Sequence, residues 1–246
     1  MANGFDPRAT ARPQPGTAGV GRESVAFDAG LRSYMLSVYN YMASGVLLTG
    51  IVALLFANSG YAAAVLTGPG LLKYLIMFSP LAFVMVLSFG ITRLSTGTAQ
   101  MLFWAFAVVM GLSMSSIFLV FTGASIAQTF FATAAAFLGL SLYGYTTKRD
   151  LSAFGTFLIM GVVGLLVASI INIFLQSGTM QLVISFIGVL LFAGLTAYDT
   201  QRIKSLYFQV AGTDMMGKTV IMGALSLYLD FVNMFTFLLQ FMGQRD

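Results

Sequence analysis

Residues 152–176 read SAFGTFLIMGVVGLLVASIINIFLQ, a run of 25 residues without a charged side chain. A helix needs about 20 mostly apolar residues to cross the hydrocarbon core of a bilayer, which is roughly 30 Å thick. A membrane-spanning strand is about half that length and alternates between polar and apolar residues, which this run does not. The stretch therefore predicts a transmembrane helix.

Six further segments share this length and composition, so the sequence predicts seven spanning helices. The predicted spans are 34–57, 71–92, 99–121, 124–145, 152–176, 180–200 and 218–242. Connections as short as Thr122–Gly123 and Ser177–Gly178 make neighbouring helices antiparallel and adjacent. We expect an all-α, polytopic membrane protein with one transmembrane domain over 34–246. Residues 1–33 are polar and rich in Pro and Gly, which predicts a flexible cytoplasmic tail.

The composition excludes several kinds of function. Of the 246 residues, 58% are hydrophobic and 8% are charged, against about 25% charged in soluble domains. The chain has no cysteine and no histidine. This excludes disulfides, histidine-ligated haem, histidine-bearing zinc sites and Ser–His or Cys–His nucleophiles. The net charge of +4 comes from residues scattered near the ends of the predicted spans, so no basic stripe predicts nucleic-acid binding.

The distribution of Lys and Arg predicts the orientation of the chain, because cytoplasmic loops carry an excess of both. With the N-terminus in the cytoplasm, two basic residues, Lys73 and Arg245, fall outside. The ten that fall inside are Arg8, Arg12, Arg22, Arg32, Arg93, Lys148, Arg149, Arg202, Lys204 and Lys218. Seven spans then place the C-terminus on the outer side.

Two of the eight acidic residues lie in apolar helices. Asp230 is central in the last predicted span, and Asp199 lies at the end of the sixth. A carboxylate at a helix centre costs about 2.5–3.5 kcal/mol to insert, so such residues face the bundle interior and often mark functional sites. The alternative for Asp230 is a structural hydrogen bond between helices. The alternative for Asp199 is an interfacial ion pair with Arg202, three residues further on.

On consecutive antiparallel helices the two acids can face each other. Both cannot ionise cheaply in a low-dielectric site, so such a pair can share a proton and act as a proton-dependent latch. Arg93, at the end of the second span, is either a basic partner of the pair or an ordinary cytoplasmic anchor. The hydroxyls of Tyr198 and Tyr228 and the amide of Asn233 are further oxygen ligands. Together with two carboxylates they suit weak, transient Ca²⁺ binding.

Several stretches of the sequence are distinctive. Two of them are AYDTQRIK at residues 197–204 and ALSLYLDFVNMFTFLLQFMG at residues 224–243. Two more are GLSMSSIFLVF in the third span and YGYTTKRDLSAFG across the next cytoplasmic connection. With these motifs, of which the first two are the most specific, the chain resembles the Bax inhibitor-1 family, also called the transmembrane Bax inhibitor motif family, and especially its bacterial members. The resemblance covers nearly the whole chain from about residue 30.

The resemblance implies a seven-helix bundle with a cytoplasmic N-terminus and the last helix at its centre. It also implies a pH-sensitive calcium leak channel gated by two hydrogen-bonded aspartates, which match Asp199 and Asp230, with a latch arginine that matches Arg93. The alternative that it implies is a non-conducting regulator that binds a membrane-bound quality-control protease or another membrane partner. An acidic residue that some relatives carry in the second span is absent here, where residues 71–92 read LLKYLIMFSPLAFVMVLSFGIT.

Two other classes of membrane protein share some of these features but do not fit. Intramembrane aspartyl proteases use a Gly-x-Gly-Asp turn, whereas Leu227, Tyr228 and Leu229 precede Asp230. A retinal-binding rhodopsin needs a lysine within its last helix, whereas Lys218 stands at the very start of that span. We therefore expect a protein of the bacterial inner membrane that is not an enzyme. We expect no cofactor, and Ca²⁺ only as a transported ion.

Overall fold

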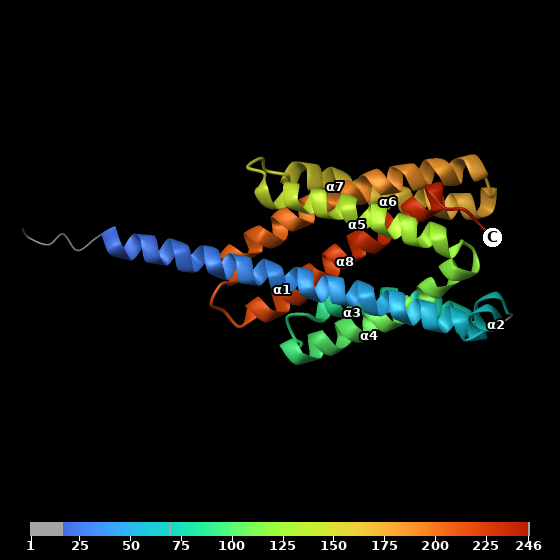
Figure 1. Cartoon of the computed structure of the whole chain (residues 1–246), viewed down its shortest axis with the longest axis horizontal. Helices are drawn as coiled ribbons and strands as arrows, with labels where there is room; N and C mark the ends of the chain where they lie inside the picture. The colour runs from blue at the N-terminus through green and yellow to red at the C-terminus, as the bar shows by residue number, and fades with distance from the viewer. Residues whose placement is uncertain (1–16, 69, 246) are drawn as a thin grey trace, which may run out of the picture.

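A computed structural model describes residues 17–68 and 70–245, which form a bundle of helices (Figure 1). In this part of the chain, seven helices are long and apolar enough to cross a membrane, which confirms the predicted class. The elements are α1 (Thr17–Asn58), α2 (Tyr61–Thr67), α3 (Leu71–Gly90), α4 (Thr96–Met114), the 3₁₀ helix η1 (Ser115–Leu119), α5 (Gly123–Thr146), α6 (Ser152–Leu175), α7 (Gly178–Val210) and α8 (Met215–Met242).

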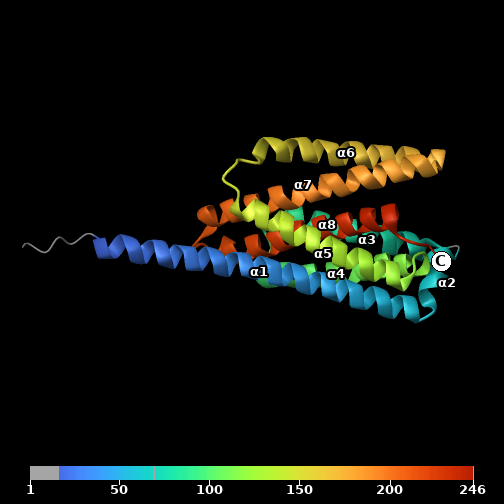
Figure 2. The same cartoon turned by 45° about the horizontal axis from the view of Figure 1, so that its top comes forward.

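The last helix, α8, lies at the centre of the bundle, as predicted. It packs against α1, α4, α5 and α7, and Figures 1 and 2 show these helices around it. In its most apolar window 67% of the residues are buried, against 17% in α6. α6 packs mainly against α7, and α3 mainly against α4. These two helices therefore form the periphery, where their apolar side chains face the lipid.

Hydroxyl side chains explain where three of the spanning helices begin. Ser95, Thr122 and Ser177 precede α4, α5 and α7, and each accepts a hydrogen bond from the backbone N–H three residues further on, at 3.1–3.3 Å. A side-chain oxygen at this position satisfies one of the N–H groups that the first helical turn leaves unpaired. The short connections predicted at Thr122–Gly123 and Ser177–Gly178 are confirmed.

The first helix begins earlier than the sequence indicates. α1 starts at Thr17, so residues 17–33, which we assigned to a flexible tail, are helical, while residues 1–16 of that tail lie outside the described residues. Leu31, Tyr34, Met35 and Val38 are all buried. This spacing of three and four residues continues one apolar stripe past the predicted start of the span.

The sixth span is also longer than predicted. α7 continues ten residues beyond Thr200 to Val210, because Thr200, Ile203 and Tyr207 keep one buried face at helical spacing. Arg202 and Lys204 in the same segment had indicated a loop. The other long connection, predicted over 58–70, contains the short helix α2.

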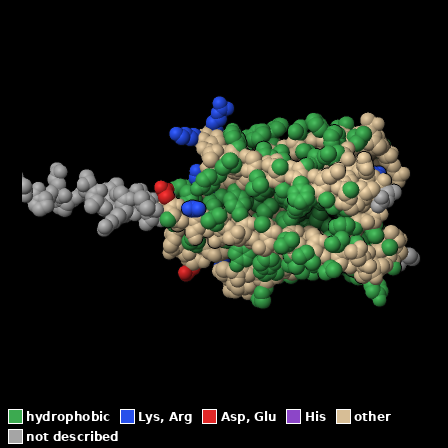
Figure 3. Space-filling view, in the orientation of Figure 1, with side chains coloured by type: hydrophobic (Ala, Val, Ile, Leu, Met, Phe, Trp, Pro, Cys, Tyr) green, Lys and Arg blue, Asp and Glu red, His purple; other side chains and the backbone are tan. Residues whose placement is uncertain are grey.

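The charged side chains gather at the ends of the bundle. The α3–α4, α5–α6 and α7–α8 connections lie at the same end as the first turns of α1, and the other connections lie at the opposite end with the C-terminus (Figure 1). In the view of Figure 3 most visible Lys and Arg side chains cluster at the first end, and apolar side chains cover the middle. This separation is that of a bilayer-spanning protein.

Candidate functional site

The two intramembrane acids lie on adjacent helices in the structure. Asp230 is near the middle of α8 and is 4% exposed. Its Oδ2 atom is buried and has no hydrogen-bond partner among the described residues. Asp199 lies in α7, and its side chain is 13% exposed. An unpartnered carboxylate oxygen in the most buried helix is costly unless it binds a proton or a cation. It is therefore the strongest indication of function in the fold.

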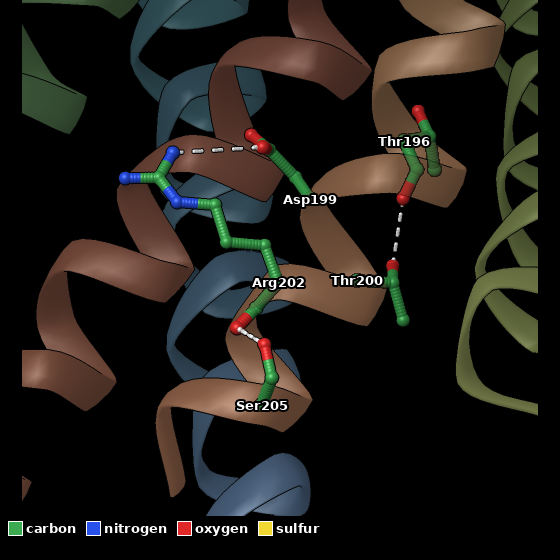
Figure 4. Close-up of polar contacts among 5 residues, drawn as sticks. All are labelled: Thr196, Asp199, Thr200, Arg202 and Ser205. Carbon is green, nitrogen blue, oxygen red and sulfur yellow. Dashed lines mark hydrogen bonds and ion pairs between the residues drawn. The ribbon is translucent and has the colours of Figure 1, made fainter. Parts of the chain in front are cut away.

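Asp199 is close enough to Asp230 for the two carboxyl groups to interact electrostatically. Figure 4 shows the Asp199 side chain pointing away from Thr196 and Thr200, on the side of α7 that faces α8. The hydrogen bond between the carboxyl groups that the family resemblance implies is not among the contacts of residues 17–68 and 70–245. A hydrogen bond between two carboxyl groups requires one of them to hold a proton, so the shared proton stays a prediction.

The basic partner of Asp199 is Arg202. Its Nη1 atom lies 3.9 Å from Asp199 Oδ1, and its side chain is 56% exposed (Figure 4). This ion pair is the alternative interpretation of Asp199 that the sequence predicts. A pair at this distance with one partner in solvent contributes little stability, about 0–1 kcal/mol. Arg202 therefore lies at the border between the acid pair and the solvent.

Arg93 does not contact either acid. It lies in the turn after α3, it is exposed, and its backbone N–H donates to Gly90 O at 2.9 Å. In the described part of the chain its side chain forms no ion pair. In this structure Arg93 therefore does not act as a partner of the acid pair, and its role as a latch stays a prediction.

The other sequence-predicted ligands form no hydrogen bond with either acid among the described residues. The Tyr198 ring packs against α6, where a Cβ added to Gly155 would lie 2.3 Å from it. The amide nitrogen of Asn233 donates to Leu229 O, one turn back in its own helix, at 2.8 Å. Tyr228 is fully buried and its hydroxyl lies 2.6 Å from Thr49 Oγ1 in α1. The structure therefore brings together Asp199 and Asp230, while Tyr198 and Tyr228 contact other helices.

The direction of the Tyr228 hydrogen bond follows from its neighbours. Thr49 Oγ1 donates its one proton to Ala107 O at 2.9 Å, so the Tyr228 O–H must be the donor to Thr49. The Tyr228 ring meets Phe103 and Phe106 edge-on, with centroids 6.3 and 5.1 Å away. Tyr228 thus joins α8 to α1 and α4, on the face of α8 away from α7.

A chain of hydroxyl groups, which the sequence did not predict, links α7 to α5 and α1 near Asp199. Thr200 Oγ1 donates to Thr196 O at 2.8 Å (Figure 4). Ser141 in α5 lies 3.0 Å from Thr200 Oγ1, and Tyr39 in α1 bonds Ser141 in turn. Since Thr200 has already used its proton, the donors run from Tyr39 through Ser141 to Thr200. The spacing of Thr196 and Thr200 on one face of α7 is the signal that could have shown this chain.

The sequence matches a protein family over most of its length. The family model described as Inhibitor of apoptosis-promoting Bax1 matches residues 31–246. The chain is 47% identical over 222 residues to protein RP147 of Rickettsia prowazekii, with 89% of this chain and 92% of the relative covered. It is 46% identical over 219 residues to the inner membrane protein YbhL of Escherichia coli K12, with 88% and 94% covered. A protein of Caulobacter vibrioides is 45% identical over 234 residues, with 90% and 92% covered. With a match of this extent to one family model and to whole bacterial relatives, the chain belongs to the Bax inhibitor-1 family of membrane proteins.

Proposed function

We propose that this protein is a proton-gated cation leak channel of the bacterial inner membrane, with Ca²⁺ as the transported ion. In this proposal Asp199 and Asp230 are the gating carboxyl groups. The observation that carries it is the buried Oδ2 atom of Asp230, which has no partner among the described residues. A relative that spans nearly the same length is named an inner membrane protein, which supports the location.

Protons are a natural signal for this pair. Two nearby carboxyl groups away from water bind a proton more readily than they carry two negative charges. Protonation changes the attraction between α7 and α8, and these are the two helices with the most extensive contact in the bundle. A change in the charge of the pair can therefore alter the packing of the central helix.

Calcium fits the chemistry of the site as a passing ion. Ca²⁺ prefers six to eight oxygen ligands, whereas no three carboxylate side chains gather within residues 17–68 and 70–245. Tyr198 and Tyr228 point elsewhere, so two carboxylates and water are the ligands available at the pair. Such a set supports weak binding, which a conducting path requires because an ion must leave as readily as it enters.

The proposed orientation places the N-terminus and the Arg202 end of the bundle in the cytoplasm. It rests on the ten-to-two distribution of basic residues. A reporter that is active only outside the cytoplasm should work when it is fused after Asp246. A reporter that works only after Gly60 or Ser177 would contradict this orientation of the last helix.

The test is calcium flux into liposomes that contain only the purified protein, measured with an internal indicator across a pH series. The parent protein should admit Ca²⁺ in a pH-dependent manner, and Asp230→Asn should abolish or displace that dependence. Asp214→Asn is the matched control, because Asp214 is an exposed acid in the α7–α8 connection and should leave the profile unchanged. Folded protein without flux at any pH would overturn the proposal. That result would favour a non-conducting regulator that binds a membrane-bound protease or another membrane partner.

A further inference from the structure

A polar pocket of about 330 Å³ lies beside the α5–α6 connection. Figure 1 shows this connection at the same end of the bundle as the α7–α8 connection. The walls of the pocket come from the α5–α6 connection, the first residue of α6 and part of α7. The lining residues are Lys148, Arg149, Asp150, Ser152, Tyr198, Gln201, Arg202 and Ser205. Three of them are cationic and one is acidic.

The three cationic side chains have hydrogen-bond capacity to spare. Among the described residues, no side-chain hydrogen bond is made by Lys148, Arg149 or Arg202, and the one ion pair of the group is the 3.9 Å contact of Arg202 with Asp199. An Arg guanidinium has five N–H donors and a Lys ammonium has three. The pocket therefore presents many unpaired donors with net positive charge.

The acid in the pocket is already occupied. Asp150 Oδ1 accepts the Ser152 backbone N–H at 2.9 Å. Hydrogen bonds from the Ser152 side chain and backbone hold the pKa of Asp150 below its ordinary value. Asp150 is thus ionised at neutral pH. Even with Arg202 paired to Asp199, the charges of Lys148 and Arg149 exceed that of Asp150, so the pocket is cationic.

The backbone of the pocket is fixed in place. Gln201 in α7 accepts the Leu151 N–H at 2.9 Å and donates to Arg149 O at 2.8 Å. One side chain therefore bonds the connection on both sides of Asp150 and ties it to α7. A preorganised site of this kind loses less entropy when it binds a ligand.

An apolar surface lies further along α6 from the pocket. Phe154 and Phe157, in the first turns of α6, are exposed and their rings stack with centroids 6.3 Å apart. They follow Ser152 of the pocket by two and five residues. The phosphate group of a lipid could lie in the cationic pocket, and its apolar chains could lie further along α6 on these two rings.

We propose that this pocket binds the phosphate group of an anionic phospholipid, with the acyl chains along Phe154 and Phe157. Arg and Lys are the usual partners of phosphate, Arg through paired N–H donors. Basic pockets between spanning helices at the cytoplasmic side are sites of this type. Arg202 lines the pocket and also pairs with Asp199. It therefore links the lipid site to the acid pair.

The test measures the thermal unfolding midpoint of the full chain in a neutral detergent, with three added ligands. They are short-chain phosphatidylglycerol, phosphatidylcholine with the same acyl chains, and inorganic phosphate. A ligand that binds only the folded state raises the midpoint as its concentration rises. Phosphatidylglycerol should raise it more than phosphatidylcholine does. Lys148→Gln and Arg149→Gln should each weaken the apparent affinity about fivefold.

Lys218→Gln is the matched control. Lys218 lies at the same end of the bundle, where its Nζ donates to Thr92 O at 3.4 Å, and it does not line the pocket. Its removal should leave the affinity unchanged. Arg202 stays in place in this experiment because it also pairs with Asp199. Flux is not the readout, so a failed lipid site and a failed channel give different results.

Three results would overturn the lipid assignment. One is an equal effect of phosphatidylglycerol and phosphatidylcholine. Another is a loss of apparent affinity for Lys218→Gln as large as that for Lys148→Gln. That result would mean that all basic residues at this end of the bundle attract the lipid, and not the pocket in particular. The third is a full effect of inorganic phosphate alone, which would make the ligand a soluble anion.

A salt titration tests the site without any variant, in case a variant fails to fold. At ~1 M salt the Debye length is about 3 Å, so the larger effect of phosphatidylglycerol on the parent protein should disappear. An advantage that persists at that salt would overturn the charge-based site.

Discussion

Asp199 and Asp230 lie within about one helical turn of the same depth in the bundle. Asp199 is eleven residues before the end of α7 at Val210, and Asp230 is fifteen residues after the start of α8 at Met215. At 1.5 Å per residue these positions are about 17 and 22 Å from the same end of the bundle. The two antiparallel helices therefore bring the acids together, although Asp199 falls at the very edge of its predicted span.

The first prediction separates the two candidate arginines. Arg202→Gln should move the pH midpoint of flux by about half a unit towards higher pH, because a positive charge beside a carboxylate favours its ionised form. The shift is small because a partly exposed pair at 3.9 Å contributes no more than about 1 kcal/mol. Arg93→Gln should leave the midpoint unchanged, since Arg93 is exposed in the α3–α4 turn. Both are measured by calcium flux in liposomes across pH. A shift for Arg93→Gln alone would restore the latch that the family resemblance implies.

Much of the fold could be predicted because long apolar runs have few alternatives. Within the described residues, each predicted span corresponds to a helix that could cross a membrane. The boundaries were less accurate where a helix is amphipathic. The segment after Thr200 contains Arg202 and Lys204, and their charges hid the buried stripe of Ile203 and Tyr207. Composition identifies a span, but only the packing partner shows where an amphipathic helix ends.

The site was predicted in part. A lone carboxylate in an apolar run is conspicuous, so Asp230 and Asp199 could be found without coordinates. The basic residue that contacts them could not be identified from the sequence. Arg93 and Arg202 both lie at the same end of the bundle, and only their positions in the folded structure distinguish them. The hydroxyl chain from Tyr39 to Thr200 was missed for a related reason. Buried Ser and Thr are common in membrane helices, and their contacts depend on how the helices are rotated.

A second prediction concerns Tyr228, for which the structure indicates a structural role. Tyr228→Phe removes the hydrogen bond to Thr49 and keeps the ring contacts with Phe103 and Phe106. The free energy of unfolding should fall by about 1 kcal/mol, while the pH profile of flux stays that of the parent. Denaturant titration in detergent measures the first quantity, and Tyr143→Phe, at an exposed position of α5, is the control. A loss of flux at unchanged stability would show that the hydroxyl does contact the ion.

A third prediction concerns the close approach of α5 to α7. A Cβ added at Gly144 would lie 2.2 Å from the backbone oxygen of Ala197, two residues from Asp199. Backbone atoms cannot rotate away as a side chain can, so Gly144→Ala should force the helices apart and cost about 1–3 kcal/mol. Gly164→Ala is the control, because nothing lies within 4 Å of its Cβ. The control should unfold at the same or a slightly higher temperature, since Ala is the better helix former. Equal stability of both variants would contradict the tight α5–α7 contact.

The last prediction is that Asp199 and Asp230 titrate as one unit. Carboxyl groups that share a proton release it in steps that belong to the pair and not to either residue. Asp199→Asn and Asp230→Asn should therefore each abolish or displace the pH dependence of flux, and the double variant should add little to either single change. The comparison is a double-mutant cycle on the pH midpoint, with insertion and folding checked for every variant. Residues that act independently give additive effects. Additive shifts would mean that Asp199 serves only as the interfacial partner of Arg202, and that Asp230 senses protons alone through its unpartnered Oδ2 atom.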